Sequence, residues 1–203
     1  ILKDQEKWVA DSTQIALYLD QIYPEHRLLR ADQHQREEAL VINQWANDLG
    51  FHVRRWGLAH ALAENDDSLD IMIGEQGYLR QFEKYSKPLL KTLVSKSYQL
   101  DAEKVAESEH YMDEIIAQLN QRLIAQGGRY FVGDRLGLAD IAVCSMLAPL
   151  LEIKGTPWEN EHGAHVSDAF NQYQQVLTDL PLGQYVKRIY ATERHFRVDW
   201  RGI

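Results

Sequence analysis

Two short runs with large apolar side chains, residues 1–3 and 7–9, stand at the start of the chain on either side of the polar turn 4–6. Such a pair of runs around a polar turn is typical of a β-hairpin. An isolated two-stranded hairpin is only marginally stable in water, so it needs further strands or helices to pack against. Because the chain also opens without a methionine, we interpret it as the later part of a longer polypeptide.

From residue 12 onward, apolar residues recur at intervals of three and four, which is the spacing of one face of an α-helix. The first predicted helix spans 12–23, where Ile15, Leu19 and Ile22 share a face and Pro24 follows. The other helices are predicted at about 33–64, with a bend at Gly50, and at 101–126, 138–153, 166–177 and 182–196. Two or three short helices are predicted between 68 and 98, and an irregular tail at 197–203.

The stretch 138–153 is apolar nearly all round, whereas the other predicted helices are apolar on one side. A helix of this kind is buried on every side, so we expect it at the centre of the fold. The sequence therefore predicts a mainly α protein, in which a helical bundle follows a β-hairpin and one helix.

The formal net charge is −8 and the isoelectric point about 5.5. This balance argues against nucleic acids and anionic membrane surfaces as partners, because proteins bind both through Lys and Arg. The longest apolar run, 141–151, is broken by Ser145 and Pro149 and is shorter than the ~20 residues that a membrane span needs.

Cys144 is the only cysteine in the chain, so an internal disulfide is excluded and a cytoplasmic location is expected. Its neighbours Val143 and Met146 are apolar, which favours a buried, unreactive thiol. The eight histidines contain no HExxH motif, and His162 and His165 fall in a predicted loop. We therefore expect no metal site and no bound cofactor.

The run Gly137-Leu138-Ala139-Asp140 stands directly before the apolar helix. A carboxylate at the third helical position can accept the backbone N–H of the capping residue. Gly137 has no side-chain oxygen to give in return, so the predicted cap is half-built and depends on Asp140. This predicts a structural role for Asp140 rather than a catalytic one.

Asp11 and Ser12 are two good capping residues side by side at the start of the first helix. If Asp11 caps the helix and Gln14 completes a capping box, Ser12 is left free. Its hydroxyl and N–H then lie at a helix N-terminus, where anions bind readily. With Asp11 beside it to hold an ammonium group, an α-amino acid end would fit. The alternative is that both residues only cap the helix.

Two segments resemble cytosolic glutathione S-transferases. The run "YFVGDRLGLADIAV", residues 130–143, is similar to the Val-Gly-Asp stretch and Ser/Thr-x-x-Asp cap of that family's C-terminal helical domain, with Gly137 in place of Ser or Thr. The run "ADSTQIALYLDQIYP", residues 10–24, resembles the end of its thioredoxin-like domain. The resemblance implies that residues 1–26 are the last part of an incomplete thioredoxin-like domain and that 33–203 form an all-helical domain.

By this resemblance, Asp11 and Ser12 bind the γ-glutamyl end of glutathione, which serves as substrate. The reaction would be conjugation to, or exchange on, a small hydrophobic electrophile, in a cytoplasmic homodimer involved in detoxification. The Tyr, Ser or Cys that activates the thiol in this family would precede Ile1, so no residue here is predicted to be catalytic. The charge run 36–38 is most simply a solvated helix face, with a dimer contact as the alternative.

Trp45, Phe51, His52, Arg55 and Trp56 form an aromatic and basic group on the long helix. The resemblance implies that this helix walls the pocket for the second substrate, with Trp45, His52 and Trp56 as candidate lining residues. In the alternative interpretation, the two tryptophans belong to the core while His52 and Arg55 are solvated.

Two other functions remain open at this point. The first is a non-catalytic binding or assembly module with the same fold. The second is glutathione-dependent thiol reduction or peroxide reduction, if the missing activating residue is a cysteine.

Overall fold

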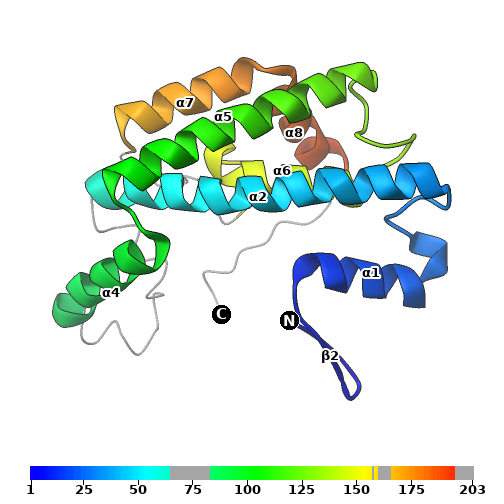
Figure 1. The fold of residues 1–203 in the computed structure, drawn as a ribbon, viewed down its shortest axis with the longest axis horizontal. Coiled ribbons are helices and arrows are strands. Elements are labelled where there is room, and N and C mark those ends of the chain that lie inside the picture. The colour runs from blue at the N-terminus through cyan, green and yellow to red at the C-terminus, as the bar shows by residue number, and fades with distance from the viewer. Residues whose placement is uncertain (65–82, 157, 160–165, 195–203) are drawn as a thin grey trace.

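The computed structural model describes residues 1–64, 83–156, 158–159 and 166–194 (Figure 1). The chain begins with an antiparallel hairpin of β1 (Leu2–Asp4) and β2 (Lys7–Val9), in which Leu2 lies opposite Val9. Helix α1 (Ser12–Ile22) and one turn of 3₁₀ helix, η1 (Pro24–His26), follow. The predicted hairpin and first helix are both confirmed, and α1 ends before Pro24, which cannot donate a backbone hydrogen bond.

After η1, all regular elements of the described chain are helices, as predicted. The helices are α2 (Gln33–Glu64), α4 (Glu83–Tyr98), α5 (Ala102–Ala125), α6 (Leu138–Leu151), α7 (Asp168–Asp179) and α8 (Pro181–Thr192). Helix α8 ends at Thr192, earlier than the periodicity predicted. The predicted short helices before residue 83, the loop with His162 and His165, and the tail 197–203 lie outside the described residues.

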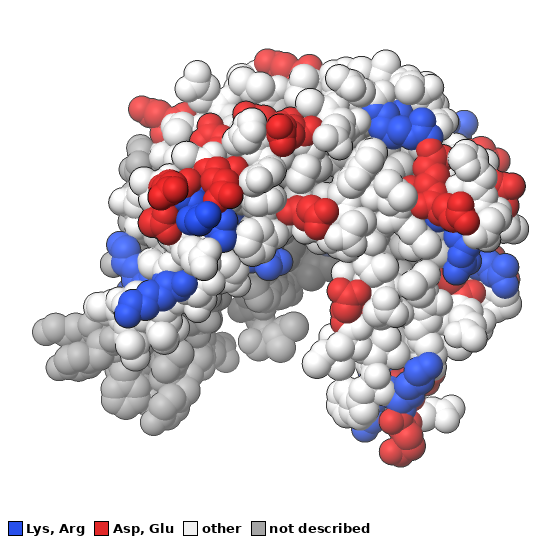
Figure 2. Space-filling view, viewed as in Figure 1, with Lys and Arg blue, Asp and Glu red and all other residues white. Residues whose placement is uncertain are grey.

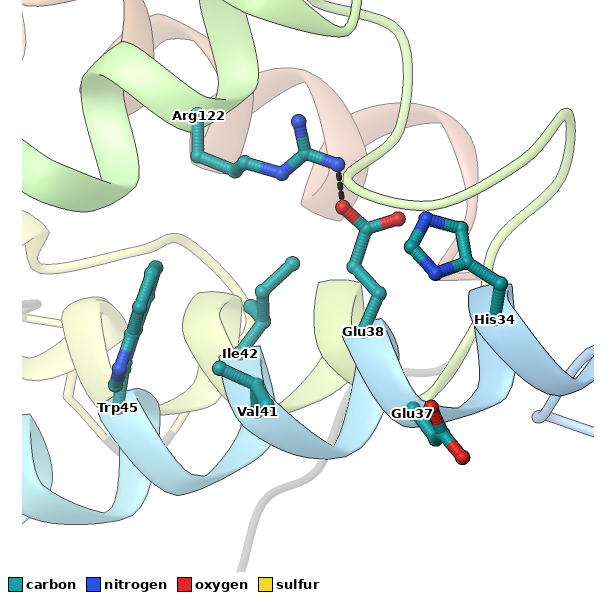
Figure 3. A pocket seen from close by; sticks show the side chains of 7 residues that line it. All are labelled: His34, Glu37, Glu38, Val41, Ile42, Trp45 and Arg122. Atoms are coloured by element: carbon teal, nitrogen blue, oxygen red, sulfur yellow. Dashed lines mark ion pairs between the residues drawn. The ribbon is translucent and has the colours of Figure 1, made fainter.

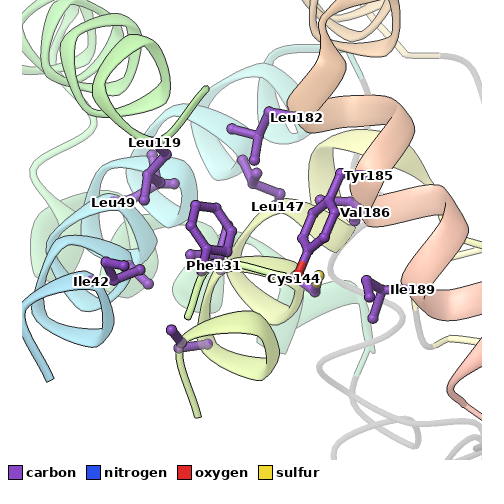
Figure 4. Packing of buried hydrophobic residues seen from close by; sticks show 14 of the residues in the cluster. Ile42, Leu49, Leu119, Phe131, Cys144, Leu147, Leu182, Tyr185, Val186 and Ile189 are labelled. Carbon is purple, nitrogen blue, oxygen red and sulfur yellow. The ribbon is translucent and has the colours of Figure 1, made fainter. Parts of the chain in front are cut away.

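Helix α6 is the centre of the bundle, as its uniform apolar character predicted. It packs on α2, α7 and α8, and α5 lies across α2 and α8 (Figure 1). Its buried side chains include Cys144 and Leu147, which lie beside residues of α8 and Phe131 of the loop before α6 (Figure 4). There the rings of Phe131 and Tyr185 stand edge to face, with centroids 5.4 Å apart.

Helix α2 is the longest element and runs without a break through Gly50. A side chain at Gly50 would overlap the sulfur of Met146 on α6, so the glycine allows these two helices to approach closely. Close packing against α6 accounts for a glycine at this position. None of the described helices is both long enough and apolar enough to cross a bilayer.

The segment between η1 and α2 is fixed by buried polar groups. The carboxylate of Asp20 in α1 accepts the N–H groups of Leu28 at 2.6 Å and Leu29 at 2.8 Å. Arg30 donates to the carbonyl oxygens of Val132, at 3.0 Å, and Arg135. The two ends of the linker are thereby tied to α1 and to the loop before α6, so the predicted linker is an ordered part of the fold.

Candidate functional site

Asp11 turns the chain from β2 into α1. Its Oδ1 accepts the N–H groups of Thr13 and Gln14, both at 3.0 Å, so Asp11 is the N-cap of the helix. Its φ of 70° and ψ of 135° are unusual for a residue with a side chain. Such a conformation costs on the order of 1–3 kcal/mol and persists only where the surrounding structure enforces it. The Asp11 half of the predicted capping box is formed, and the Gln14 side chain is exposed.

Ser12 is the first residue of α1 and is exposed. Neither its hydroxyl nor its N–H has a partner among the residues that the structure describes. Because an 11-residue helix begins here, the positive end of its dipole adds to these two donors. The corner formed by Asp11 and Ser12 is therefore open to solvent and chemically suited to a small anion.

The neighbouring Thr13 is bonded to helix α2. Its Oγ1 accepts from Asn43 Nδ2 at 2.9 Å and from Asn47 Nδ2 at 3.3 Å. This contact was not predicted, although the two asparagines are four residues apart and so share one helix face. The four-residue spacing could have indicated a shared polar face of α2, but not that this face meets Thr13.

The hairpin is held against α1 by side chains of its own. Tyr18 donates its hydroxyl to Asp4 Oδ2 at 2.5 Å, and the hydrogen bond to this carboxylate raises the pKa of the Tyr18 hydroxyl. Lys7 Nζ lies over the Tyr18 ring, 4.1 Å from its centre. These contacts fix the strand that leads into the Asp11 corner.

The aromatic and basic group on α2 divides between core and surface. Trp56 is 1% exposed, and its indole N–H donates to Glu109 at 3.0 Å. Arg55 is buried too and donates to the carbonyl oxygen of Tyr98 at 2.8 Å, so the expectation of a solvated Arg55 is wrong. His52 is half-buried, and its ring stacks on that of Tyr111 in α5.

Trp45, His52 and Trp56 point towards α5, whereas Asn43 and Asn47 point towards α1. The residues of a helix are rotated by about 100° each, so Trp45 lies about 200° around α2 from Asn43. The structure consequently does not bring the three predicted lining residues together with Ser12. Trp56 is a core residue, which was the alternative interpretation for the tryptophans.

Trp45 lines a groove of about 300 Å³ between α2 and α5 (Figure 3). Val41, Ile42 and Trp45 form its apolar wall, while Glu38 and Arg122 form an ion pair across one end. The remaining lining residues are His34 and Glu37. The charge run 36–38 is thus only partly a solvated face, because Glu38 joins the two helices.

Asp140 lies inside the bundle and is 1% exposed. Its Oδ2 accepts the N–H of Gly137 at 2.7 Å, the contact expected from the spacing. Its Oδ1 accepts the N–H of Phe131 at 2.8 Å and the hydroxyl of Tyr185 at 2.5 Å. Burial raises the pKa of this carboxyl, and the three donors compensate part of the cost. Asp140 is accordingly a structural residue, and Tyr185 is a partner that sequence analysis missed.

The glycine at position 137 also has a tertiary explanation. A Cβ there would lie 2.8 Å from the carbonyl oxygen of Leu28. That oxygen accepts the N–H of Leu138 at 3.1 Å, so the linker takes one of the free donors at the start of α6. The linker backbone therefore satisfies the first free N–H of α6, and a side chain at position 137 would displace it.

The remaining candidates give no site. Cys144 is 3% exposed, and burial raises the pKa of its thiol. Within the described ranges, no three His, Cys, Asp or Glu side chains gather in a way that could hold a metal ion.

The family model for the glutathione S-transferase C-terminal domain matches residues 78–187, which is just over half of the chain. The chain belongs to the glutathione S-transferase C-terminal domain family. The matched range contains α5, α6, α7 and the Gly137–Asp140 cap, and the helical bundle agrees with this family's fold. The Ser12 corner lies outside the matched range, so the family match does not extend to that site. Comparison with curated proteins and with solved structures found no significant match.

Proposed function

We propose that this glutathione S-transferase family member binds glutathione at the Ser12 corner and transfers or exchanges its thiol on a small, hydrophobic electrophile. The observation that carries the proposal is the open corner, where the N–H and hydroxyl of Ser12 have no partner in the described structure. Membership of the family makes glutathione the first ligand to test at this corner.

The chemistry of the corner suits the γ-glutamyl end of glutathione. A carboxylate at Ser12 would accept charge-assisted hydrogen bonds, each with a net contribution of roughly 1.5–3 kcal/mol. The helix dipole would add about 0.3–1 kcal/mol. Asp11 uses Oδ1 for the helix cap, which leaves Oδ2 to accept from the ligand's ammonium group. Two donors at Ser12 for the ligand's carboxylate, next to the Asp11 carboxylate for its ammonium group, would select an α-amino acid end.

In the proposed reaction, the glutathione sulfur attacks the electrophilic atom of the second substrate as a thiolate. A sulfur–carbon bond forms, and the electron pair leaves with the departing group or moves onto the acceptor. A thiol with a pKa near that of free cysteine, about 8.5, is mostly protonated at neutral pH, so an activating group is required. We assign this role to no residue of the described structure. Cys144 is also unsuited to thiol reduction, because it is buried and its pKa is raised.

The groove beside Trp45 and the charges at 36–38 fit the additional proposal of a homodimer that uses the α2–α5 side. The single, buried cysteine fits a reducing cytoplasm. A non-catalytic glutathione-binding module is the alternative function. Conjugation assays with small electrophiles, run on protein that binds glutathione, would separate the two.

We expect Ser12→Ala in the full-length protein to weaken glutathione binding at least about fivefold, because both the hydroxyl and its charge-assisted hydrogen bond are lost. Isothermal titration calorimetry with reduced glutathione measures this directly. Ser97→Ala, at an exposed position of α4, is the matched control and should bind like the wild type. Unchanged affinity in Ser12→Ala would remove the corner from the site.

A further inference from the structure

The contact between Thr13 and α2 places a buried amide next to the proposed binding corner. Asn43 is 4% exposed, and Asn47 is half-buried one turn further along α2. Burying an amide costs free energy unless its donors are used, and Asn43 spends one of them on Thr13 Oγ1 at 2.9 Å. Two helix residues thus converge on a single oxygen in the first turn of α1.

We propose that Asn43 and Asn47 are positioning residues of the glutathione site, and that Thr13 is the side chain through which they act. This inference depends on the proposed function, since it concerns the same corner. The two asparagines do not contact the ligand. They hold the first turn of α1 in the orientation that presents the N–H and hydroxyl of Ser12 to a carboxylate.

Thr13 is held from both sides of the corner. Its backbone N–H donates to Asp11 Oδ1 at 3.0 Å, which fixes it to the chain leaving β2. Its Oγ1 has two acceptor lone pairs, and Asn43 and Asn47 occupy both. Asp11 therefore orients the main chain of Thr13, and the two asparagines of α2 orient its side chain.

This double attachment matters because the other buried polar contact of α1, made by Asp20 with the linker, lies two turns away from the corner. Ala16 is the only residue of α1 among the buried apolar residues of the described core. The conformation of Asp11, with φ of 70°, must also be enforced by its surroundings. A binding group has to be held to within about 0.5 Å to be effective, and neighbouring hydrogen bonds usually provide this precision. The hydrogen bonds from α2 to Thr13 are placed to do so.

A purely structural role predicts a different result from a positioning role. If the contact only joins α1 to the bundle, its loss should lower the melting temperature and leave glutathione affinity unchanged in the folded protein. If it positions the corner, affinity should fall even where the protein remains folded, and a residue that restores the oxygen should restore the affinity.

The experiment compares Thr13→Val with Thr13→Ser in the full-length protein, titrated with reduced glutathione in a calorimeter. Valine keeps the shape but removes the acceptor, whereas serine keeps the oxygen. We expect Thr13→Val to bind at least about fivefold more weakly and Thr13→Ser to stay within about twofold of the wild type. Asn47→Ala, at a half-buried position, provides a second variant if Thr13→Val does not fold, and should weaken binding in the same direction.

Two controls complete the design. Gln44→Ala removes an exposed side chain of α2 that bonds only to Asp48 in the described structure, and should have no effect on affinity. Ile116→Val weakens the core away from the corner, and should lower the melting temperature with unchanged affinity.

The outcomes distinguish this inference from the proposed function. If Ser12→Ala weakens binding while Thr13→Val and Asn47→Ala bind like the wild type, the positioning role is wrong and the corner stands. If affinity in Thr13→Ser falls as far as in Thr13→Val, the oxygen is not what matters, and the inference is again overturned. If Ser12→Ala has no effect, the proposed function itself fails.

Discussion

At the scale of single residues, buried polar side chains determine how the segments meet. Asp20 binds two N–H groups of the linker, and Asp140 binds donors from the loop before α6 and from α8. A buried carboxylate without such donors would be strongly unfavourable, so each of them fixes the position of several backbone groups. The spacing in the sequence predicted the bond from Asp140 to Gly137. It did not predict the partners of Asp20, because these lie eight and nine residues away beyond a turn.

His52 should make stability depend on pH. Its ring packs on Tyr111 and its Nδ1 lies 3.2 Å from Ser108 Oγ, with Arg55, Glu107 and Asp48 as the charged neighbours. Burial, and then the nearby Arg55, lowers the pKa of His52 in the folded protein. The unfolded chain therefore takes up this proton first as the pH falls below the ordinary value of about 6.5. We expect the free energy of unfolding to decrease with falling pH from that point until the lower folded pKa is passed.

The measurement is thermal unfolding of wild type and His52→Gln at about pH 7.5 and about pH 5.5, on either side of the ordinary histidine pKa. The drop in melting temperature between the two conditions should be smaller in His52→Gln. His26→Gln is the control, because His26 is exposed and has no side-chain hydrogen bond or ion pair among the described residues. An equal drop in wild type and His52→Gln would show that this histidine does not couple folding to pH.

At the scale of elements, close backbone approach decides how α7 and α8 pack. A Cβ at Gly183 would fall well inside contact distance of the Leu177 carbonyl oxygen, so the first turn of α8 lies directly against the last turns of α7. Leu180 has no side-chain oxygen with which to cap α8, and Asn120 of α5 takes its place by accepting the N–H of Leu182 at 2.9 Å. Three helices are joined at this one helix start.

Gly183→Ala should therefore destabilise the protein, whereas the same change at Gly57 should not. The added methyl at Gly183 has to push α7 and α8 apart, and overpacking of this kind costs about 1–3 kcal/mol. At Gly57 in α2, nothing lies within 4 Å of the added Cβ, and alanine favours a helix by up to about 1 kcal/mol over glycine. Urea unfolding of the two variants gives both free energies, and a Gly183→Ala protein as stable as Gly57→Ala would contradict the packing described.

At the scale of the whole molecule, a bundle with one main core and a small second cluster around Leu62 and Val94 carries a less buried hairpin and α1. The main core draws most of its buried residues from α2, α5, α6, α7 and α8 and only Ala16 from α1, whereas the β2 residue Trp8 is 66% exposed. In the space-filling view, the hairpin projects from the bundle, and both acidic and basic side chains lie on the face shown (Figure 2). The molecule is therefore expected to open in parts rather than all at once.

Hydrogen exchange should reveal this difference in the full-length protein. We expect the backbone amides of α6 to exchange most slowly, since opening them requires unfolding the core. The amides of α1 should exchange faster, and glutathione at the Ser12 corner should slow those of the first turn if it binds there. Mass-spectrometric exchange of peptides from α1 and α6 tests both statements. Equal protection in the two helices without ligand would contradict the division of the molecule proposed here.

Much of the candidate site could be predicted from the sequence, but its surroundings could not. Asp11 and Ser12 were recognisable because capping residues act within four positions of one another. The contact of Thr13 with Asn43 and Asn47 joins residues about thirty positions apart, and no local spacing encodes it. For the same reason, the sequence did not show that Trp45 and His52 lie on the side of α2 that faces away from the Ser12 corner. The domain boundary between residues 26 and 33 stays a prediction.

The order of residues along the chain was enough to predict the local structure: the hairpin, the helices with their periodic apolar faces, the central position of α6 and the N-cap at Asp11. These follow from interactions between residues close in the chain and from the burial of apolar faces. The packed bundle was needed to show which helix faces meet, why glycine stands at 137 and 183, and that Thr13 is bonded to α2. Those features depend on distances between segments far apart in the sequence, which become fixed only when the bundle packs.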